Sequence, residues 1–275
     1  MSRQASVLRS LSLSIFLAVL VATLPAASAQ VTDLDQIQVA PPIRQVAPPS
    51  PTASAEELEK QGDDLRSQKA YLDAIDYFDA ALKKAPDDAV IWNKMGISEL
   101  MLQRYREAER DFKAAIRRDP KLGEAYNNLG VVQYERRKYG AAIKQYKRAL
   151  KVSPESASFY SNLGAAYFSQ KKFEPATVAY SRAIELDPQI FEHSSRTGIA
   201  AQMSSPQDRA HYSYVLAKLY AKAGDSDRSL SYLRKAMEEG YKKVGDAYKD
   251  PEFASLRKDA RFDELMKERP APLPE

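Results

Sequence analysis

The sequence predicts an all-α protein built from stacked helical hairpins. Small, aromatic and proline residues recur every 34 residues between Ala55 and Ile190. Within each period, apolar residues lie three or four positions apart, as on one face of a helix. A proline closes each period, where a helix has to end. A fixed period of this length is typical of a solenoid, in which neighbouring hairpins bury each other's faces.

The composition argues against several classes of function. The chain has 275 residues, no cysteine and two histidines, which leaves little material for nucleophilic, redox or metal chemistry. There is no glycine-rich phosphate loop and no catalytic triad motif. We therefore expect no enzymatic activity, no metal site, no cofactor and no small-molecule substrate. The net charge of +4 is too small to predict nucleic-acid binding.

Residues 1–29 have the features of a secretory signal peptide. Arg3 and Arg9 precede an apolar run at 13–24, and residues 27–29 form a small-x-small cleavage site. The run is shorter than the roughly 20 residues of a spanning helix, so we expect cleavage, with an uncleaved anchor as the alternative. The absence of cysteine excludes a lipoprotein. We expect a periplasmic or secreted protein; the signal is typical of prokaryotes, and a eukaryotic secretory signal is the alternative.

Residues 30–54 are predicted to form a proline-rich linker. The tetrapeptide Val-Ala-Pro-Pro occurs at 39–42 and again at 46–49. Paired prolines favour the extended polyproline II conformation, so a stiff tether is the preferred interpretation. A ligand for another protein's aromatic groove, or simple disorder, are the alternatives. Ser54, with Glu57 three residues later, predicts a capping box at the start of the first helix.

Each period reads as two helices that pack closely. In residues 157–190, the first helix is predicted around Gly164 and the second around Ala176, with a break at 169–172. The small residues allow the helices to approach, and the aromatic side chains fill the remaining space. The phased positions are Gly62, Gly96, Gly130, Gly164; Ala74, Ala108, Ala142, Ala176; Phe78, Phe112, Tyr146, Tyr180; Ala81, Ala115, Ala149, Ala183; and Pro86, Pro120, Pro154, Pro188.

These positions resemble the tetratricopeptide repeat (TPR) family. The resemblance implies a right-handed solenoid with units at 55–88, 89–122, 123–156 and 157–190. The first unit has the weakest signature, as expected of a terminal cap. The fourth unit carries the whole family pattern: Tyr160, Leu163, Gly164, Tyr167, Ala176, Tyr180, Ala183 and Pro188.

The period breaks after Pro188. An insert at 191–209 is predicted to be a surface loop or irregular helix, or alternatively a segment folded into the groove. Ser205, Pro206 and Asp208 predict a helix start. A degenerate fifth unit follows at 210–240, and a cap and tail at 241–275, with short helices predicted from Asp250 and from Asp259.

The resemblance also implies that the first helix of each unit lines a concave groove. Exposed amides at these positions suit the backbone of an extended peptide, and exposed apolar residues would form a floor. The alternative is that some of them pack against the next unit. Glu59 and Asp63 would repel a terminal carboxylate, so we expect an internal peptide or a helix as ligand. The predicted binding residues are Asn93, Ile97, Leu100, Asn127, Asn128, Val131, Tyr134, Asn162, Ala165 and Phe168.

The predicted function is a non-enzymatic scaffold or adaptor that binds protein segments in this groove, in the bacterial envelope. The alternative is a factor that associates peripherally with a membrane or an anionic polymer through a basic convex face. That face carries Arg104, Arg106, Arg110, Lys113, Arg117, Arg118, Arg136, Arg137, Lys138, Lys144, Lys147, Arg148 and Lys151.

Overall fold

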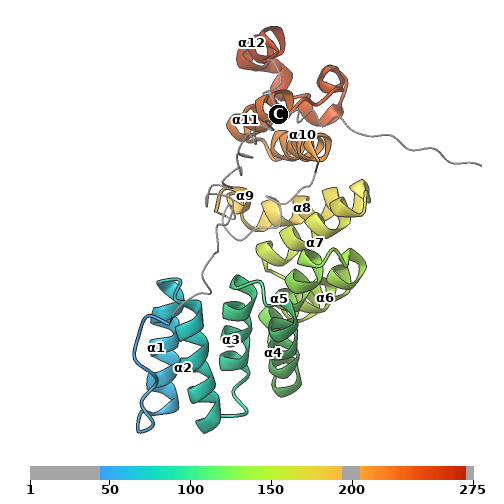
Figure 1. Ribbon diagram of the computed structural model, residues 1–275. Helices are drawn as coiled ribbons and strands as arrows, with labels where there is room; N and C mark the ends of the chain where they lie inside the picture. Colours follow the sequence, from blue (N-terminus) through green and yellow to red (C-terminus); the bar gives the residue numbers. More distant parts are fainter. Residues whose placement is uncertain (1–43, 194–204, 271–275) are drawn as a thin grey trace, which may run out of the picture. The chain divides into compact units, whose positions relative to one another are not determined.

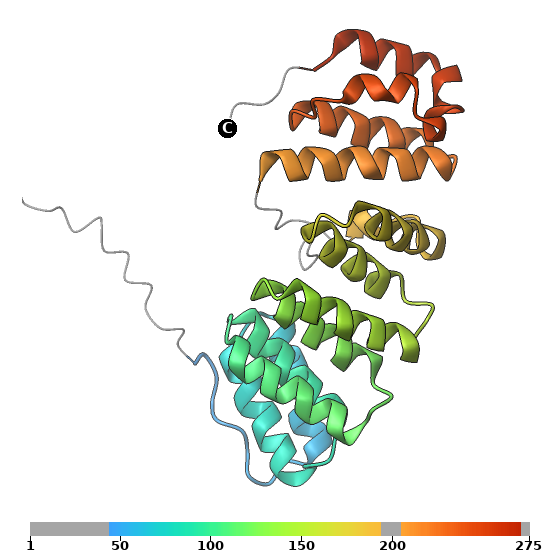
Figure 2. The same ribbon diagram turned by 90° about the vertical axis from the view of Figure 1, so that its right-hand side faces the viewer.

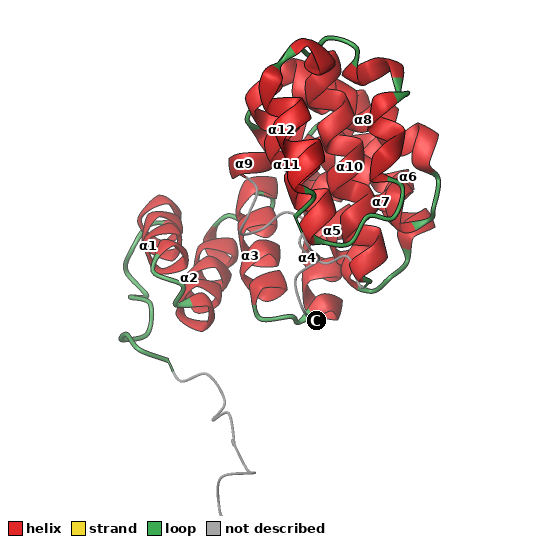
Figure 3. Cartoon of the chain, turned by 90° about the horizontal axis from the view of Figure 1, so that it is seen from above, coloured by secondary structure: helices red, strands yellow, loops and turns green. Residues whose placement is uncertain are grey.

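The computed structural model describes residues 44–193 and 205–270, and every regular element in these ranges is helical. The predicted all-α fold is therefore confirmed (Figures 1 and 3). The α-helices are α1 (Ala55–Ser67), α2 (Tyr71–Lys84), α3 (Ala89–Met101), α4 (Tyr105–Arg118), α5 (Gly123–Glu135), α6 (Tyr139–Val152), α7 (Ala157–Ser169), α8 (Phe173–Leu186), α9 (Ile190–His193), α10 (Pro206–Lys222), α11 (Ser226–Glu238) and α12 (Ala260–Glu268).

Consecutive helices pair into antiparallel hairpins, α1 with α2 through α7 with α8, and α10 with α11 (Figure 2). The phased glycines explain how the two helices of a hairpin approach. A Cβ built on Gly130 would lie 2.5 Å from the ring of Tyr146, and one built on Gly164 would lie 2.5 Å from the ring of Tyr180. Both rings are fully buried, so only glycine leaves room for them.

The turn inside each of the first four hairpins uses one residue in the left-handed region. These residues are 34 apart and have φ between 57° and 64°; they are Lys69, Gln103, Arg137 and Lys171. None is glycine, so each turn adopts a backbone conformation that a side chain disfavours. In the fifth hairpin, Gly224 takes this role with φ of 82°.

The predicted helix starts are confirmed at both ends of the repeat array. Ser54 accepts a hydrogen bond from the Glu57 amide, and Glu57 accepts one from the Ser54 amide, which completes the capping box of α1. Ser205 caps α10 by accepting from the amide of Asp208, with Pro206 in the first turn.

The segment after α8 differs from the predicted surface loop at its beginning. Ile190 and Phe191 of α9 are buried, and the Phe191 ring contacts Tyr180 and Tyr212 edge to face. These two large apolar side chains are buried because they cover the end of the fourth hairpin and so leave water. Residues 194–204 of the predicted insert lie outside the described residues. Helix α10 begins at Pro206, inside the range predicted for the insert.

The C-terminal cap is more irregular than predicted. The short helix predicted from Asp250 is the 3₁₀ helix Pro251–Phe253, with Asp250 at its N-cap, and further 3₁₀ helices lie at Val244–Tyr248 and Leu256–Lys258. The helix predicted from Asp259 is α12, which Asp259 caps. Phe253, Leu256 and Phe262 are buried with residues of α10 and α11, so this segment covers the last hairpin.

The end of the proline-rich segment is docked rather than free. Among the described residues 44–53, the amides of Gln45 and Val46 donate to Asp73, and Lys84 Nζ donates to the Pro51 carbonyl at 2.9 Å. The stiff-tether prediction is therefore wrong for this part, because backbone hydrogen bonds hold it on α2. The predicted signal peptide lies outside the described residues. Among the residues that the structure describes, no helix is long and apolar enough to cross a membrane.

Candidate functional site

The front-helix face consists of the side chains that α1, α3, α5 and α7 present at matching repeat positions. Its predicted amides form a ladder. Asn162 Nδ2 donates to Asn127 Oδ1 at 2.9 Å, and Asn128 Nδ2 donates to Asn93 Oδ1 at 3.0 Å. Asn127 Nδ2 also donates to Asn128 Oδ1 at 3.3 Å, which joins the two rungs into one continuous chain. Four predicted residues are thus brought together across three helices, but Asn93 and Asn127 are buried rather than exposed as predicted.

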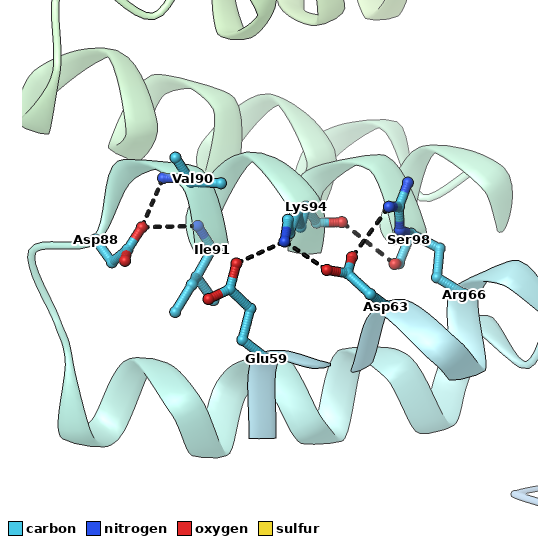
Figure 4. Close-up of polar contacts among 8 residues, drawn as sticks. All are labelled: Glu59, Asp63, Arg66, Asp88, Val90, Ile91, Lys94 and Ser98. Atoms are coloured by element: carbon cyan, nitrogen blue, oxygen red, sulfur yellow. Dashed lines mark hydrogen bonds and ion pairs between the residues drawn. The ribbon is translucent and has the colours of Figure 1, made fainter. Parts of the chain in front are cut away.

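Lys94 extends the ladder to the first hairpin (Figure 4). Its Nζ donates to Glu59 Oε1 and to Asp63 Oδ2, both at 2.5 Å, and Arg66 donates to the other oxygen of Asp63. Burial would lower the pKa of Lys94, but the two carboxylates outweigh burial and raise it. Lys94 therefore stays protonated at neutral pH and links α3 to α1.

The ladder follows one rule. At each junction between the first four units, the fifth helix position of the earlier unit accepts and the sixth position of the later unit donates. The partners therefore lie 35 residues apart, one more than the period. Lys94, Glu59 and Asp63 are absent from the predicted site. A search for donor–acceptor pairs 35 apart would have found Lys94 opposite Glu59.

The predicted apolar floor is wrong as an exposed surface at three positions. Tyr134, Ala165 and Phe168 are only 4 %, 2 % and 1 % exposed. The ring of Phe168 packs against His211 and Tyr212 of α10, at centroid distances of 5.4 and 5.8 Å. The next hairpin therefore covers it.

Tyr134 is covered in the same way. Its hydroxyl is 2.8 Å from Ser169 Oγ, and burial raises its pKa to about 12. Ile97, Leu100 and Val131 keep part of their surface, while Val90 and Met101 of α3 are the exposed apolar residues of this face at 45 % and 42 %. The accessible apolar surface therefore lies on α3 and at Val131 of α5, not on α7.

The amides keep unused hydrogen-bonding capacity. A side-chain amide has two donor hydrogens and an oxygen with two lone pairs. Each hydrogen bond of the ladder uses only one hydrogen and one lone pair. Asn128 and Asn162 are half-buried, so they can offer the remainder to a ligand.

The basic side chains of the back helices differ between α4 and α6. On α4, Lys113 pairs with Glu109 at 2.6 Å and Arg110 pairs with Asp111 at 2.8 Å. Residues 136–154, which contain α6, include no acid. An exposed cation stripe runs along this part: Arg137, Lys138, Lys144, Lys147, Arg148 and Lys151.

Two hollows flank α10 where the repeat period is interrupted. One, of about 900 Å³, lies between α7, α8 and α10 and is lined by Leu163, Val178 and Leu219 with Lys218. The other, of about 820 Å³, lies between α8 and the start of α11. The side chain of Val178 is 70 % exposed at the first hollow. Neither hollow follows from the sequence, because both depend on how α10 packs on α8.

Three titratable groups with shifted pKa values, Glu99, Asp111 and His211, lie in packed surroundings. Burial raises the pKa values of Glu99 and Asp111, and it lowers the pKa of His211, which stacks edge to face on Phe173. Within residues 44–193 and 205–270, no group of three histidine or acidic residues has the geometry of a metal site. The pKa shifts of Glu99, Asp111 and His211 therefore follow from packing.

Several solved structures are similar to this chain. The crystal structure of MamA is 23 % identical, covers 67 % of this chain and 96 % of its own, and has a TM-score of 0.47. MamA from residue 41 to its end, from Desulfovibrio magneticus RS-1, is 19 % identical, with coverages of 69 % and 97 % and a TM-score of 0.49. YrrB, described as a TPR protein with an unusual peptide-binding site, is 19 % identical, with coverages of 68 % and 87 % and a TM-score of 0.46. No curated protein matches the sequence.

Family profiles match the helical hairpins directly. Tetratricopeptide repeat profiles match residues 93–143, 157–190 and 210–239, and a TPR repeat profile matches 134–171. The third of these ranges coincides with the hairpin of α10 and α11, whose repeat signature is weak. The phased glycines, the packed aromatic rings and these matches agree, and the chain is a tetratricopeptide repeat protein.

Proposed function

We propose that the protein is a non-enzymatic scaffold that binds a segment of another protein on its front-helix face. The observation that carries this proposal is the amide ladder, which is fixed by its own hydrogen bonds and still has donors and acceptors to offer. A preorganised site loses little conformational freedom on binding. Val90 and Met101, both exposed on α3, supply apolar contacts beside the ladder.

The ligand that fits is an extended peptide or a helix with one apolar stripe. An extended backbone alternates donors and acceptors, as the amides of Asn128 and Asn162 require. The predicted signal peptide at residues 1–29 supports export, so we place the scaffold in the bacterial periplasm or outside the cell.

The test is a differential pull-down from an envelope extract of the source organism. One bait carries Val90→Glu and Met101→Glu, which leave the core intact because both side chains are exposed. A control bait carries Val178→Glu, which adds one negative charge at an exposed apolar residue of α8, where the double variant adds two on α3. We expect a partner that binds the parent and the control but not the double variant. A partner that is lost only with Val178→Glu would instead assign binding to the hollow beside α10.

A second function is favoured by the cation stripe on α6. Exposed cations without interleaved acids attract anionic surfaces such as acidic phospholipids. Lys144, Lys147 and Lys151 share one helix face at spacings of three and four. Vesicle co-sedimentation of the parent and of a Lys144→Glu, Lys151→Glu variant tests it. Binding that depends on the two lysines and falls steeply with salt would support a peripheral membrane role.

A further inference from the structure

A second peptide site lies on α2, outside the front-helix face. An extended segment of the chain runs along this helix and is held through its backbone. The amide of Gln45 donates to both oxygens of Asp73, at 3.0 and 3.1 Å, and the amide of Val46 donates to Asp73 Oδ1 at 3.2 Å. Asp73 is only 2 % exposed, so this carboxylate is built into the helix surface with its oxygens committed to the segment.

The next contacts continue along the same segment. The hydroxyl of Tyr77 donates to the Ala47 carbonyl at 3.2 Å, and Arg44 forms an ion pair with Asp76. Tyr77, Asp73 and Asp76 line a hollow of about 190 Å³ together with the prolines at 48–49. The site therefore has a buried anion and a hydroxyl donor in a row along α2.

This arrangement requires a particular kind of ligand. Two consecutive free amides must face Asp73, so neither Gln45 nor Val46 could be proline. A carbonyl must face Tyr77 one residue later. Proline at the next position then holds Ala47 in the extended conformation that brings this carbonyl to Tyr77.

The sequence contains this ligand twice. Residues 45–49 are Gln-Val-Ala-Pro-Pro, and residues 38–42 are the same five residues. The described range begins at Arg44, so the structure contains only the second copy. The copies differ in the residue before them, which is Arg44 in the second copy and Ile37 in the first.

We propose that α2 carries a binding site for the peptide Gln-Val-Ala-Pro-Pro, which residues 45–49 fill in the structure and for which residues 38–42 are a second ligand. Every hydrogen bond between α2 and the pentapeptide uses a backbone group that both copies possess. Only the ion pair of Arg44 with Asp76 distinguishes them, and it favours the second copy. Two tethered ligands thus compete for one site, and an external peptide has to displace them.

Fluorescence anisotropy with a labelled synthetic peptide tests the proposal. The probe has the sequence of residues 36–43, Gln-Ile-Gln-Val-Ala-Pro-Pro-Ile. The receptor is the full chain with proline at positions 38, 39, 45 and 46 (Gln38→Pro, Val39→Pro, Gln45→Pro, Val46→Pro), which removes the amide donors of both internal copies. We expect this open-site chain to bind the probe at least tenfold more tightly than the parent chain does.

Two controls keep the result specific. A probe with proline in place of its second glutamine and its valine should not bind, because it has no amides for Asp73. Tyr77→Phe in the open-site chain removes one hydroxyl without changing the fold. It should weaken the affinity for the probe about two- to fivefold. An open-site chain that melts like the parent but does not bind the probe would overturn the proposal. Equal binding of the two probes, or equal binding by the parent and open-site chains, would also overturn it.

Discussion

The side-chain amide of Asn162 donates a hydrogen bond to the side-chain carbonyl of Asn127, 35 residues earlier, at 2.9 Å. The bond joins the front helices of neighbouring repeats. Asn127 is almost fully buried, so its amide depends on this rung and on Asn128 for hydrogen bonds. The rung is therefore both a structural contact and the support of the proposed binding face.

Asn127→Ala is expected to lower the free energy of unfolding by about 1–3 kcal/mol, because it removes the acceptor of Asn162 Nδ2 and the donor to Asn128 Oδ1. Chemical denaturation measures the loss. Ser158→Ala changes an exposed residue of α7 and should stay within about 0.5 kcal/mol of the parent. A double variant with Asn162→Ala should lose less than the sum of the single changes, and strict additivity would argue against the rung.

Gly130→Ala is expected to destabilise the protein by about 1–3 kcal/mol, although alanine is the better helix former. The added methyl would lie 2.5 Å from the buried ring of Tyr146. Gly140→Ala on α6 is the matched control, since its Cβ would meet only Gln170, at 3.5 Å. In thermal unfolding, the midpoint temperature of the control should be equal to or higher than that of the parent, and the midpoint of Gly130→Ala should be lower.

Gly224→Ala tests backbone conformation without a steric clash. Its φ is 82° and a Cβ would meet no atom within 4 Å, so any loss comes from the left-handed conformation. We expect about 1–2 kcal/mol of destabilisation by denaturation. Gly245→Ala has equally open space and no left-handed φ, and it should be close to neutral. Equal losses in the two variants would contradict this explanation.

Because the hydroxyl of Tyr134 is buried, we expect the free energy of unfolding to fall at alkaline pH. Burial raises its pKa to about 12 in the folded protein, from an ordinary value near 10. The folded state therefore holds its proton more tightly, and stability falls as pH rises from about 10 to 12. Tyr134→Phe should flatten the dependence of unfolding free energy on pH in that window. Absorbance at a tyrosinate wavelength should show one fewer late-titrating tyrosine, and an unchanged titration would contradict the assignment.

The repeated part of the fold was predictable because its signals are local and periodic. Gly164 and Ala176 identify where two helices touch, and Ser54 with Glu57 identifies where the first helix begins. The amide ladder was predictable as a set of residues, since its members occupy matching positions. Its mutual hydrogen bonds follow from the 35-residue offset, which the 34-residue period by itself does not reveal.

The remaining features depend on contacts between distant segments. Phe168 was expected on an exposed floor, but His211 and Tyr212 of α10 cover it. The docked segment was misread as a tether because its prolines suggest a free chain. Its anchors are backbone amides, and their acceptor, Asp73, lies 28 residues further along the chain.

The 35-residue offset also determines how the chain could be lengthened. Each inner unit carries an acceptor at its fifth position and a donor at its sixth, as Asn127 and Asn128 show. A duplicate of residues 123–156 inserted after Ser156 would continue the ladder at both new junctions. The fifth hairpin could not be copied in this way, because Tyr214 and Val215 occupy the two positions. The proposed binding surface can thus grow in whole repeats, but only on the N-terminal side of α7.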